Sequence, residues 1–195
     1  MNNPGAWAVG PGGAEAKWIN SPLSSCTGLY SLLRVNASAA GPNPKRLLLV
    51  DDNPADLELA RYAFEEAGVD ASNIDMVRDG EEALQYLRRQ GDYAGRITPH
   101  PTLVLLDVNM PRLNGVETLQ RLKADPILQT LPVVMLTTSG HAEDMERSYR
   151  HGANGYVVKP VDLAAFLEVA RTLRAFWMNI NLAYTSPRSA TPAGR

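Results

Sequence analysis

The sequence lacks the features that mark several large classes of protein. Its single cysteine, Cys26, excludes an intramolecular disulfide and cannot supply a thiolate metal cluster by itself. No apolar stretch approaches the ~18 residues of a membrane-spanning helix, so we expect a cytoplasmic protein that does not interact with a membrane. Nineteen basic against 21 acidic residues give a net charge of −2. This balance argues against nucleic acid as a partner, because nucleic-acid binding by counterion release requires a basic surface.

The remaining composition is that of an ordinary globular chain, but it is unevenly distributed. Hydrophobic residues make up 45% of the 195 positions, which is sufficient for a core. Residues 1–44 contain six Gly and five Pro and have no periodic pattern, which predicts a flexible leader. Residues 184–195 are expected to form a flexible tail. Between them, residues 45–183 carry 15 basic and 20 acidic side chains, and we expect them to form one domain.

Short apolar runs alternate with amphipathic stretches throughout this domain. We expect a helix cap at each of Asn53, Asp79 and Asp162, and we expect the second helix to stop at Gly91. Five βα repeats predict an α/β fold, a doubly wound parallel sheet with helices on both faces. The expected strands are residues 47–50, 74–77, 102–106, 133–136 and 155–158.

Polar residues follow four of these strands, at the sheet edge where such folds bind ligands. They are Asp51 and Asp52 after the first strand, Asp107 after the third, Thr137 after the fourth and Lys159 after the fifth. Each alone has an ordinary interpretation, as a helix cap, a strand residue, a loop acid or a surface charge. Together they favour a site, because three converging carboxylates require a compensating cation. With neither His nor Cys in these loops, Mg²⁺ is the favoured ion.

Four segments resemble the signature segments of the response-regulator receiver domain of two-component signalling. The spacings also fit, with 55 residues from Asp52 to Asp107, 30 from there to Thr137 and 22 more to Lys159. The resemblance implies a flavodoxin-like receiver fold of five strands in the order 2-1-3-4-5 with five helices. The segments are residues 46–53 (RLLLVDDN), 105–111 (LLDVNMP), 135–139 (MLTTS) and 156–160 (YVVKP).

The resemblance also implies the roles of individual residues. Asp107 matches the aspartate that accepts the phosphoryl group. Asp51 and Asp52 match the acidic pair that binds Mg²⁺, or Mn²⁺ in its place, together with Asp107 and the backbone carbonyl of Asn109. Because phosphoryl transfer passes through a loose transition state, positioning and charge neutralisation supply most of its catalysis.

Further positions match the switch of this family. Thr137 matches the hydroxyl that turns toward the phosphoryl group, Tyr156 the aromatic residue that follows it inward, and Lys159 the lysine that pairs with a phosphoryl oxygen. The bond between Lys159 and Pro160 is usually cis in the family, which would direct the lysine. Phosphorylation is then expected to change the surface of the fourth helix, fifth strand and fifth helix.

The implied function is that of a single-domain response regulator phosphorylated by a sensor histidine kinase. Such a protein is not an enzyme in the ordinary sense, since it catalyses its own phosphorylation and loses the group slowly. A closer resemblance is to receivers paired with bacterial and cyanobacterial phytochrome histidine kinases, which predicts a kinase of that type. It rests on the long loop 91–101, on residues 122–126 (LKADP), 132–139 (PVVMLTTS) and 159–163 (KPVDL), on Ser148-Tyr149, on Phe166 and on Phe176-Trp177.

Large apolar residues crowd the end of the last helix, beyond what one helix face can bury. Five of them fall within residues 176–182. They either cap the core or form a homodimer contact, and we favour the homodimer, with Phe166, Phe176 and Trp177 at the interface.

Other functions are possible for a chain with this fold. A receiver could act as a phosphorelay intermediate or as a docking scaffold without its own output. A haloacid-dehalogenase-type phosphatase needs a second Asp two positions after Asp107, where Asn109 stands. A flavodoxin-like FMN binder needs a phosphate-binding loop after the first strand, where Asp51 and Asp52 would repel phosphate.

Overall fold

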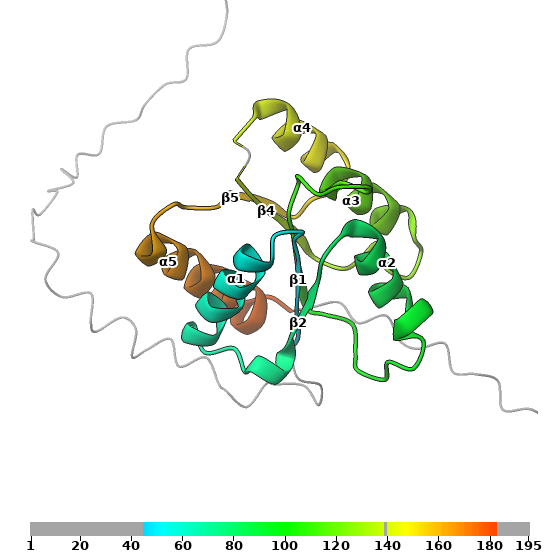
Figure 1. The fold of residues 1–195 in the computed structure, drawn as a ribbon, viewed down its shortest axis with the longest axis horizontal. Helices are drawn as coiled ribbons and strands as arrows, with labels where there is room; N and C mark the ends of the chain where they lie inside the picture. Colours follow the sequence, from blue (N-terminus) through cyan, green and yellow to red (C-terminus); the bar gives the residue numbers. More distant parts are fainter. Residues whose placement is uncertain (1–44, 139, 183–195) are drawn as a thin grey trace, which may run out of the picture. The chain divides into compact units, whose positions relative to one another are not determined.

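The computed structural model describes residues 45–138 and 140–182, so the expected leader and tail lie outside the described residues. Five parallel strands form one sheet in the order β2-β1-β3-β4-β5, which confirms the predicted topology (Figure 1). β3 begins one residue later than expected and β4 ends one residue later. The strands are β1 (Leu47–Val50), β2 (Ile74–Val77), β3 (Leu103–Leu106), β4 (Val133–Thr137) and β5 (Gly155–Val158).

The helices cover both faces of this sheet. α1 and α5 pack together on one face, and α2 and α3 lie on the other with α4 beside α3 (Figure 1). None of the helices in the part of the chain that the structure describes is long and apolar enough to cross a membrane. The α-helices are α1 (Pro54–Glu66), α2 (Gly80–Arg88), α3 (Gly115–Ala124), α4 (Ala142–Arg150) and α5 (Leu163–Arg174). The shorter helices are η3 (Ala71–Asn73), η4 (Gly91–Tyr93) and the π-helical η5 (Ala175–Ile180), which continues α5.

Side-chain caps begin α1, α2 and α5 where the sequence predicts them. The side chains of Asn53, Asp79 and Asp162 each accept a hydrogen bond from a backbone N–H in the first turn. The expected stop of α2 at Gly91 is wrong. The helix ends at Arg88, because Arg89 takes the left-handed conformation (φ 57°) that usually falls to glycine at a helix C-terminus.

The central strands are buried on both faces, as expected of a parallel sheet. Leu48 and Val50 of β1 belong to the core under α2 and α3, whereas Leu47 and Leu49 belong to the core under α1 and α5. β1, β3 and β4 are buried along their whole length, but the edge strand β5 is only partly buried. The sheet therefore has a rigid centre and a more open edge at β5.

The long loop 91–101 is fixed to α2 by Arg96. Its guanidinium lies 4.0 Å from the centre of the Tyr86 ring and donates hydrogen bonds to the carbonyl oxygens of Thr98 and Pro99. His100 at the end of this loop is half-buried. Burial lowers the pKa of His100, and the charges of Arg89 and Arg96 lower it further.

Close backbone packing at Gly115 leads to a stability prediction. A Cβ at this position would overlap the carbonyl oxygen of Asp107 and lie 2.8 Å from its carbonyl carbon. We expect Gly115→Ala to lower the free energy of unfolding by about 2 kcal/mol or more, because backbone must move to admit the methyl group. Urea unfolding measures the change. The matched control is Gly95→Ala, where a Cβ meets nothing within 4 Å; equal stability of the two variants would contradict the prediction.

Candidate functional site

Two acidic residues stand directly after the central strands, held by the hydrogen bonding of the sheet. The backbone N–H of Asp51 donates to the carbonyl oxygen of Val77 at 3.2 Å, and that of Asp107 donates to the carbonyl oxygen of Val50 at 2.9 Å. Neighbouring parallel strands thus place both carboxylates at one sheet edge. Their second bonds come from local turns, since the N–H groups of Asn53 and Asn109 donate to Asp51 Oδ1 (2.9 Å) and Asp107 Oδ2 (2.6 Å).

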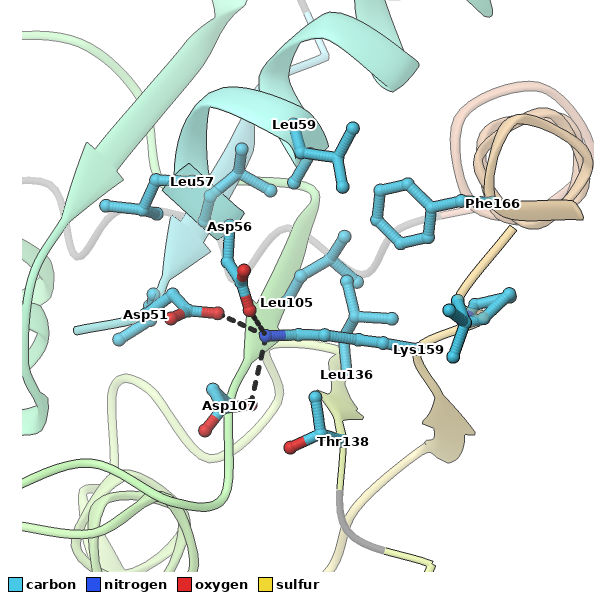
Figure 2. A pocket seen from close by; sticks show the side chains of 15 residues that line it. Asp51, Asp56, Leu57, Leu59, Leu105, Asp107, Leu136, Thr138, Lys159 and Phe166 are labelled. Atoms are coloured by element: carbon cyan, nitrogen blue, oxygen red, sulfur yellow. Dashed lines mark hydrogen bonds and ion pairs between the residues drawn. The ribbon is translucent and has the colours of Figure 1, made fainter. Parts of the chain in front are cut away.

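The ammonium of Lys159 joins these carboxylates. Its Nζ lies 2.5 Å from Asp51 Oδ2, 2.8 Å from Asp56 Oδ2 and 3.2 Å from Asp107 Oδ1 (Figure 2). The backbone of Lys159 is fixed as well, because its N–H donates to the carbonyl oxygen of Thr137 at 2.7 Å. One cationic group is therefore shared among three carboxylates. Two of them directly follow β1 and β3, and the third lies in α1.

Most of this cluster is removed from solvent. The side chains of Asp107, Asp51 and Lys159 are 6%, 10% and 12% exposed. Burial raises the pKa of Asp51 and outweighs the opposing contributions of Lys159 and the Asn53 N–H. Burial would lower the pKa of Lys159, but the hydrogen bonds and charges of the three carboxylates together raise it above its ordinary value. The lysine is therefore held as a cation at neutral pH.

Asp56 was not among the residues expected in the site. It lies in the first turn of α1 and contacts Lys159 directly. One feature of the sequence could have indicated Asp56 as a site residue. It lies in the first turn of the helix that begins immediately after the acidic pair, and side chains in that turn border the same strand ends. An acid in a first helical turn is so commonly explained by the helix dipole that its spacing alone does not indicate a site.

The other expected site residues surround this cluster at different depths. Asp52 is exposed, and within residues 45–138 and 140–182 it makes no ion pair with the cluster, so Asp56 and not Asp52 is the third carboxylate on the lysine. Asn109 is exposed, next to Asp107. Thr137 is fully buried at the end of β4, and Tyr156 of β5 is half-buried against the core under α2 and α3.

The peptide bond between Lys159 and Pro160 corrects one expectation. No peptide bond in the described residues is cis, so the bond is trans and the expected cis conformation is wrong. Proline allows either isomer at a small difference in free energy. The lysine reaches the carboxylates from the trans backbone, with its N–H hydrogen-bonded to Thr137 across the β4–β5 pair.

An apolar cavity of about 150 Å³ adjoins the cluster between α1 and α5 (Figure 2). Leu57, Leu105 and Phe166 form part of its wall, and Lys159 closes its polar end. Phe166 is only 4% exposed, so it belongs to the core of the chain itself and not to an exposed surface. Its expected place in a subunit interface is therefore not supported by its burial, because a packed core residue offers little area to a partner.

The donor groups at this edge suit a hard cation. Asp51 and Asp107 come close enough to share one positive charge, and neither His nor Cys lies beside them. Mg²⁺ accepts one or two carboxylates and retains several waters, so two buried carboxylates suffice for it. In the described residues no group of three or more His, Cys, Asp or Glu side chains is arranged as a complete metal site. The oxygen donors therefore fit Mg²⁺, and the ammonium of Lys159 balances part of their negative charge.

Comparison with known proteins agrees with this geometry. Residues 47–171 match the family of the response regulator receiver domain. The chain belongs to this family. In agreement with the predicted fold, the receiver aligns with a crystal structure of the phosphorylated cyanobacterial phytochrome response regulator RcpA, with a TM-score of 0.67 and 36% identity over 72% of this chain and 99% of that one.

Other relatives of this receiver are response regulators too. Response regulator Rcp1 of Synechocystis sp. is 36% identical over 135 residues, which is 69% of this chain and 90% of Rcp1. A crystal structure shows Rcp1 in its Mn²⁺-bound form, with a TM-score of 0.64 and 33% identity over 73% of this chain and 100% of that one. The bacteriophytochrome response regulator AtBRR is 42% identical over 72% of this chain and 100% of its own, with a TM-score of 0.59.

Because the carboxylate of Asp51 is buried, replacing it with a neutral group is expected to raise the free energy of unfolding. Because folding raises the pKa of Asp51, the folded state binds the proton more tightly and stability falls as pH rises through the carboxyl range. We expect Asp51→Asn to unfold at higher urea concentration at pH 7, by on the order of 1 kcal/mol. The advantage over wild type should shrink in acid, where the native carboxyl is protonated.

Urea titrations at neutral and acidic pH, without divalent cations, check this. Asp52→Asn is the control, since Asp52 is exposed, and its effect should stay within about 0.5 kcal/mol. An Asp51→Asn variant less stable than wild type at pH 7 would show that the ion pair with Lys159 outweighs the cost of burying the carboxylate.

Proposed function

We propose that this receiver accepts a phosphoryl group on Asp107 from a sensor histidine kinase of the phytochrome type. The observation that carries the proposal is the contact of Lys159 Nζ with Asp107 Oδ1 at 3.2 Å, in a cluster that buries both side chains. An acceptor carboxylate needs a fixed position and a nearby cation to neutralise the incoming charge. Asp107 has both, from its backbone hydrogen bond to β1 and from the lysine.

The transfer follows from the chemistry of the carboxylate. An oxygen of Asp107 attacks the phosphorus and forms a new P–O bond, while the bond from phosphorus to the histidine nitrogen of the kinase breaks. The bonding electrons leave with that nitrogen, and the imidazole ring takes up a proton from water, so neutral imidazole is released. The negative charge on the phosphoryl oxygens is stabilised by the ammonium of Lys159, which the surrounding carboxylates keep protonated.

Asp51, Asp52, Asp107 and the backbone carbonyl of Asn109 are the groups that would hold Mg²⁺, or Mn²⁺ in its place. When bound, the cation neutralises negative charge on the phosphoryl oxygens and orients the group for transfer. Asp51 is already at the site, held through Oδ1 by the Asn53 N–H. Asp52 is exposed in the same loop, directly after Asp51.

The response to phosphorylation is proposed to pass through Thr137 and Tyr156 to α4, β5 and α5. An aspartyl phosphate adds about −1.5 to −2 charges at the site. The new oxygens attract Lys159 and the hydroxyl of Thr137, and the Tyr156 ring follows into the space that the threonine leaves. Slow hydrolysis would return the receiver to its resting state.

The kinase type is inferred from the relatives. RcpA and AtBRR are phytochrome response regulators by name, and they match about 72% of this chain. We therefore infer a phytochrome-type kinase as the phosphoryl donor. The cytoplasm, expected from the sequence, is the proposed compartment. A labelled phytochrome kinase that transfers phosphoryl to this receiver faster than an unrelated sensor kinase does would support the pairing.

Removing the acceptor carboxylate should abolish phosphorylation. We expect wild-type protein to become labelled with acetyl phosphate and Mg²⁺, and Asp107→Asn to remain at background, because an amide is not a nucleophile at phosphorus. Incorporation of labelled phosphate, followed by acid-stability and mass analysis of the modified peptide, measures the effect.

The matched control for this experiment is Asp92→Asn, which removes an exposed carboxylate far from the strand ends. It should label like wild type. Equal label on wild type and Asp107→Asn would refute the assignment of the acceptor. A wild-type protein that takes no label from either acetyl phosphate or a phosphorylated kinase would favour the docking scaffold.

We also propose that the receiver forms a homodimer through α5 and η5. Exposed apolar side chains gather there, with Phe176 at 47%, Ile180 at 66% and Leu182 at 90% exposure. Phe176 packs edge-to-face against Trp177, with ring centres 5.0 Å apart, which stiffens the exposed aromatic. Rigid apolar groups lose little conformational entropy on association, so they are suited to an interface.

A charge placed in this patch should weaken the dimer. We expect Phe176→Asp to raise the dimer dissociation constant by at least about tenfold, since a buried carboxylate without a partner opposes association. Sedimentation velocity across the micromolar range measures it. Ile97→Asp is the control, because Ile97 is 89% exposed in the loop 91–101, away from η5. A wild-type protein that stays monomeric at high micromolar concentration, phosphorylated or not, would refute the dimer.

A further inference from the structure

Asp56 reaches the site from α1 and is held in place on both of its oxygens. Its Oδ2 is 2.8 Å from Lys159 Nζ. Its Oδ1 accepts a hydrogen bond from Nδ2 of Asn53 at 3.1 Å, and Asn53 also caps α1 by accepting from the Ala55 N–H. The cap residue thus orients the carboxylate through Oδ1. The other oxygen of Asp56 meets the ammonium of Lys159 (Figure 2).

The three carboxylates on Lys159 differ in what they can do. Asp51 and Asp107 are the acids proposed to bind the divalent cation, and Asp56 is not. Asp56 is also the most exposed of the three, at 30% against 10% and 6%. It lies at the rim of the cluster, where the N-terminal end of α1 favours its negative charge.

A buried ammonium is costly without a counter-ion. When Asp51 and Asp107 direct their oxygens to a divalent cation, they attract Lys159 less, and the cation repels the ammonium. Lys159 is only 12% exposed, so an ammonium left without a partner would carry a desolvation penalty. Asp56 is the remaining carboxylate that contacts it.

We propose that Asp56 is a positioning residue, which retains the Lys159 ammonium in the site while Asp51 and Asp107 engage a divalent cation. The inference rests on the proposed function of this site. When the cation binds, Lys159 exchanges three carboxylate partners for one, which is Asp56. Asp56 therefore makes binding of the cation more favourable. The lysine then remains beside the acceptor carboxylate, available to the phosphoryl oxygens.

A neighbouring acid separates this role from a simple effect of charge. Glu58 lies two residues further along α1, and its side chain is 58% exposed and pairs with Arg61 at 2.8 Å. Glu58→Gln therefore removes one negative charge from the same end of the same helix without touching Lys159. Asp56→Asn removes the same charge together with the contact.

The test is a double-mutant cycle of wild type, Asp56→Asn, Lys159→Met and the double variant, with Asp56→Glu and Glu58→Gln as two further variants. Each protein is titrated with Mg²⁺ in the absence of any phosphodonor. Binding is followed through the amide signals of Asn53 and Asn109, whose N–H groups donate to Asp51 and Asp107. We expect Asp56→Asn to raise the Mg²⁺ dissociation constant about fivefold in the wild-type background and less than about twofold beside Lys159→Met. Asp56→Glu should recover part of the affinity, and Glu58→Gln should stay within about twofold of wild type.

Three results would overturn the inference. Equal weakening by Asp56→Asn with and without the lysine would mean that Asp56 acts only as a distant charge. Unchanged affinity in Asp56→Asn would mean that Asp56 does not assist a cation at all. No Mg²⁺ uptake by wild type would overturn the inference together with the proposed cation site. Because the titration contains no phosphodonor, the comparison of Asp56→Asn with wild type is independent of whether Asp107 becomes labelled, so failure of Asp56 to assist the cation is distinguishable from failure of the proposed phosphoryl transfer.

Discussion

A buried ammonium shared among carboxylates is the interaction around which this molecule is organised. Taking Lys159 and its acidic partners out of water is costly, and the cost is recovered only if their geometry is fixed. Both effects are visible in the pKa values of the cluster. Burial raises the pKa of Asp51 in spite of its contact with Lys159, and attraction to the carboxylates raises the pKa of Lys159 in spite of its burial. The cluster therefore depends on the contacts of one lysine with Asp51, Asp56 and Asp107.

The parallel sheet supplies the fixed geometry that this cluster needs. Asp51 and Asp107 are each one residue beyond a fully buried strand, and each is tied by its backbone to the neighbouring strand. α3 approaches the backbone of Asp107 so closely that only glycine fits at Gly115. Packing on both faces therefore restrains the backbone of the acids, and only their side chains and the lysine are left to respond to a ligand.

Much of this arrangement follows from short-range patterns in the sequence. Apolar runs and helix caps locate the strands, and residues directly after a strand must meet at the sheet edge, so Asp51, Asp107 and Lys159 were predictable. The contact of Asp56 depends on how far the first turn of α1 leans over that edge, which no local pattern encodes. The burial of Phe166 in its own core could not be predicted for a related reason, because a helical stripe shows that a residue is apolar but not whether its own chain or a partner covers it. The trans bond before Pro160 is likewise set by the surrounding backbone.

Burial is distributed unevenly over the strands of the sheet. β1, β3 and β4 are buried throughout, whereas β5 is partly exposed and, within the described residues, pairs with β4 alone. Lys159 follows this edge strand, with its backbone bonded to β4 and its ammonium at the acids. Segments with fewer buried contacts open and shift at lower free energy than the core does. Lys159 therefore follows the least buried strand of the described sheet, whereas Asp51 and Asp107 follow two strands that are buried along their whole length.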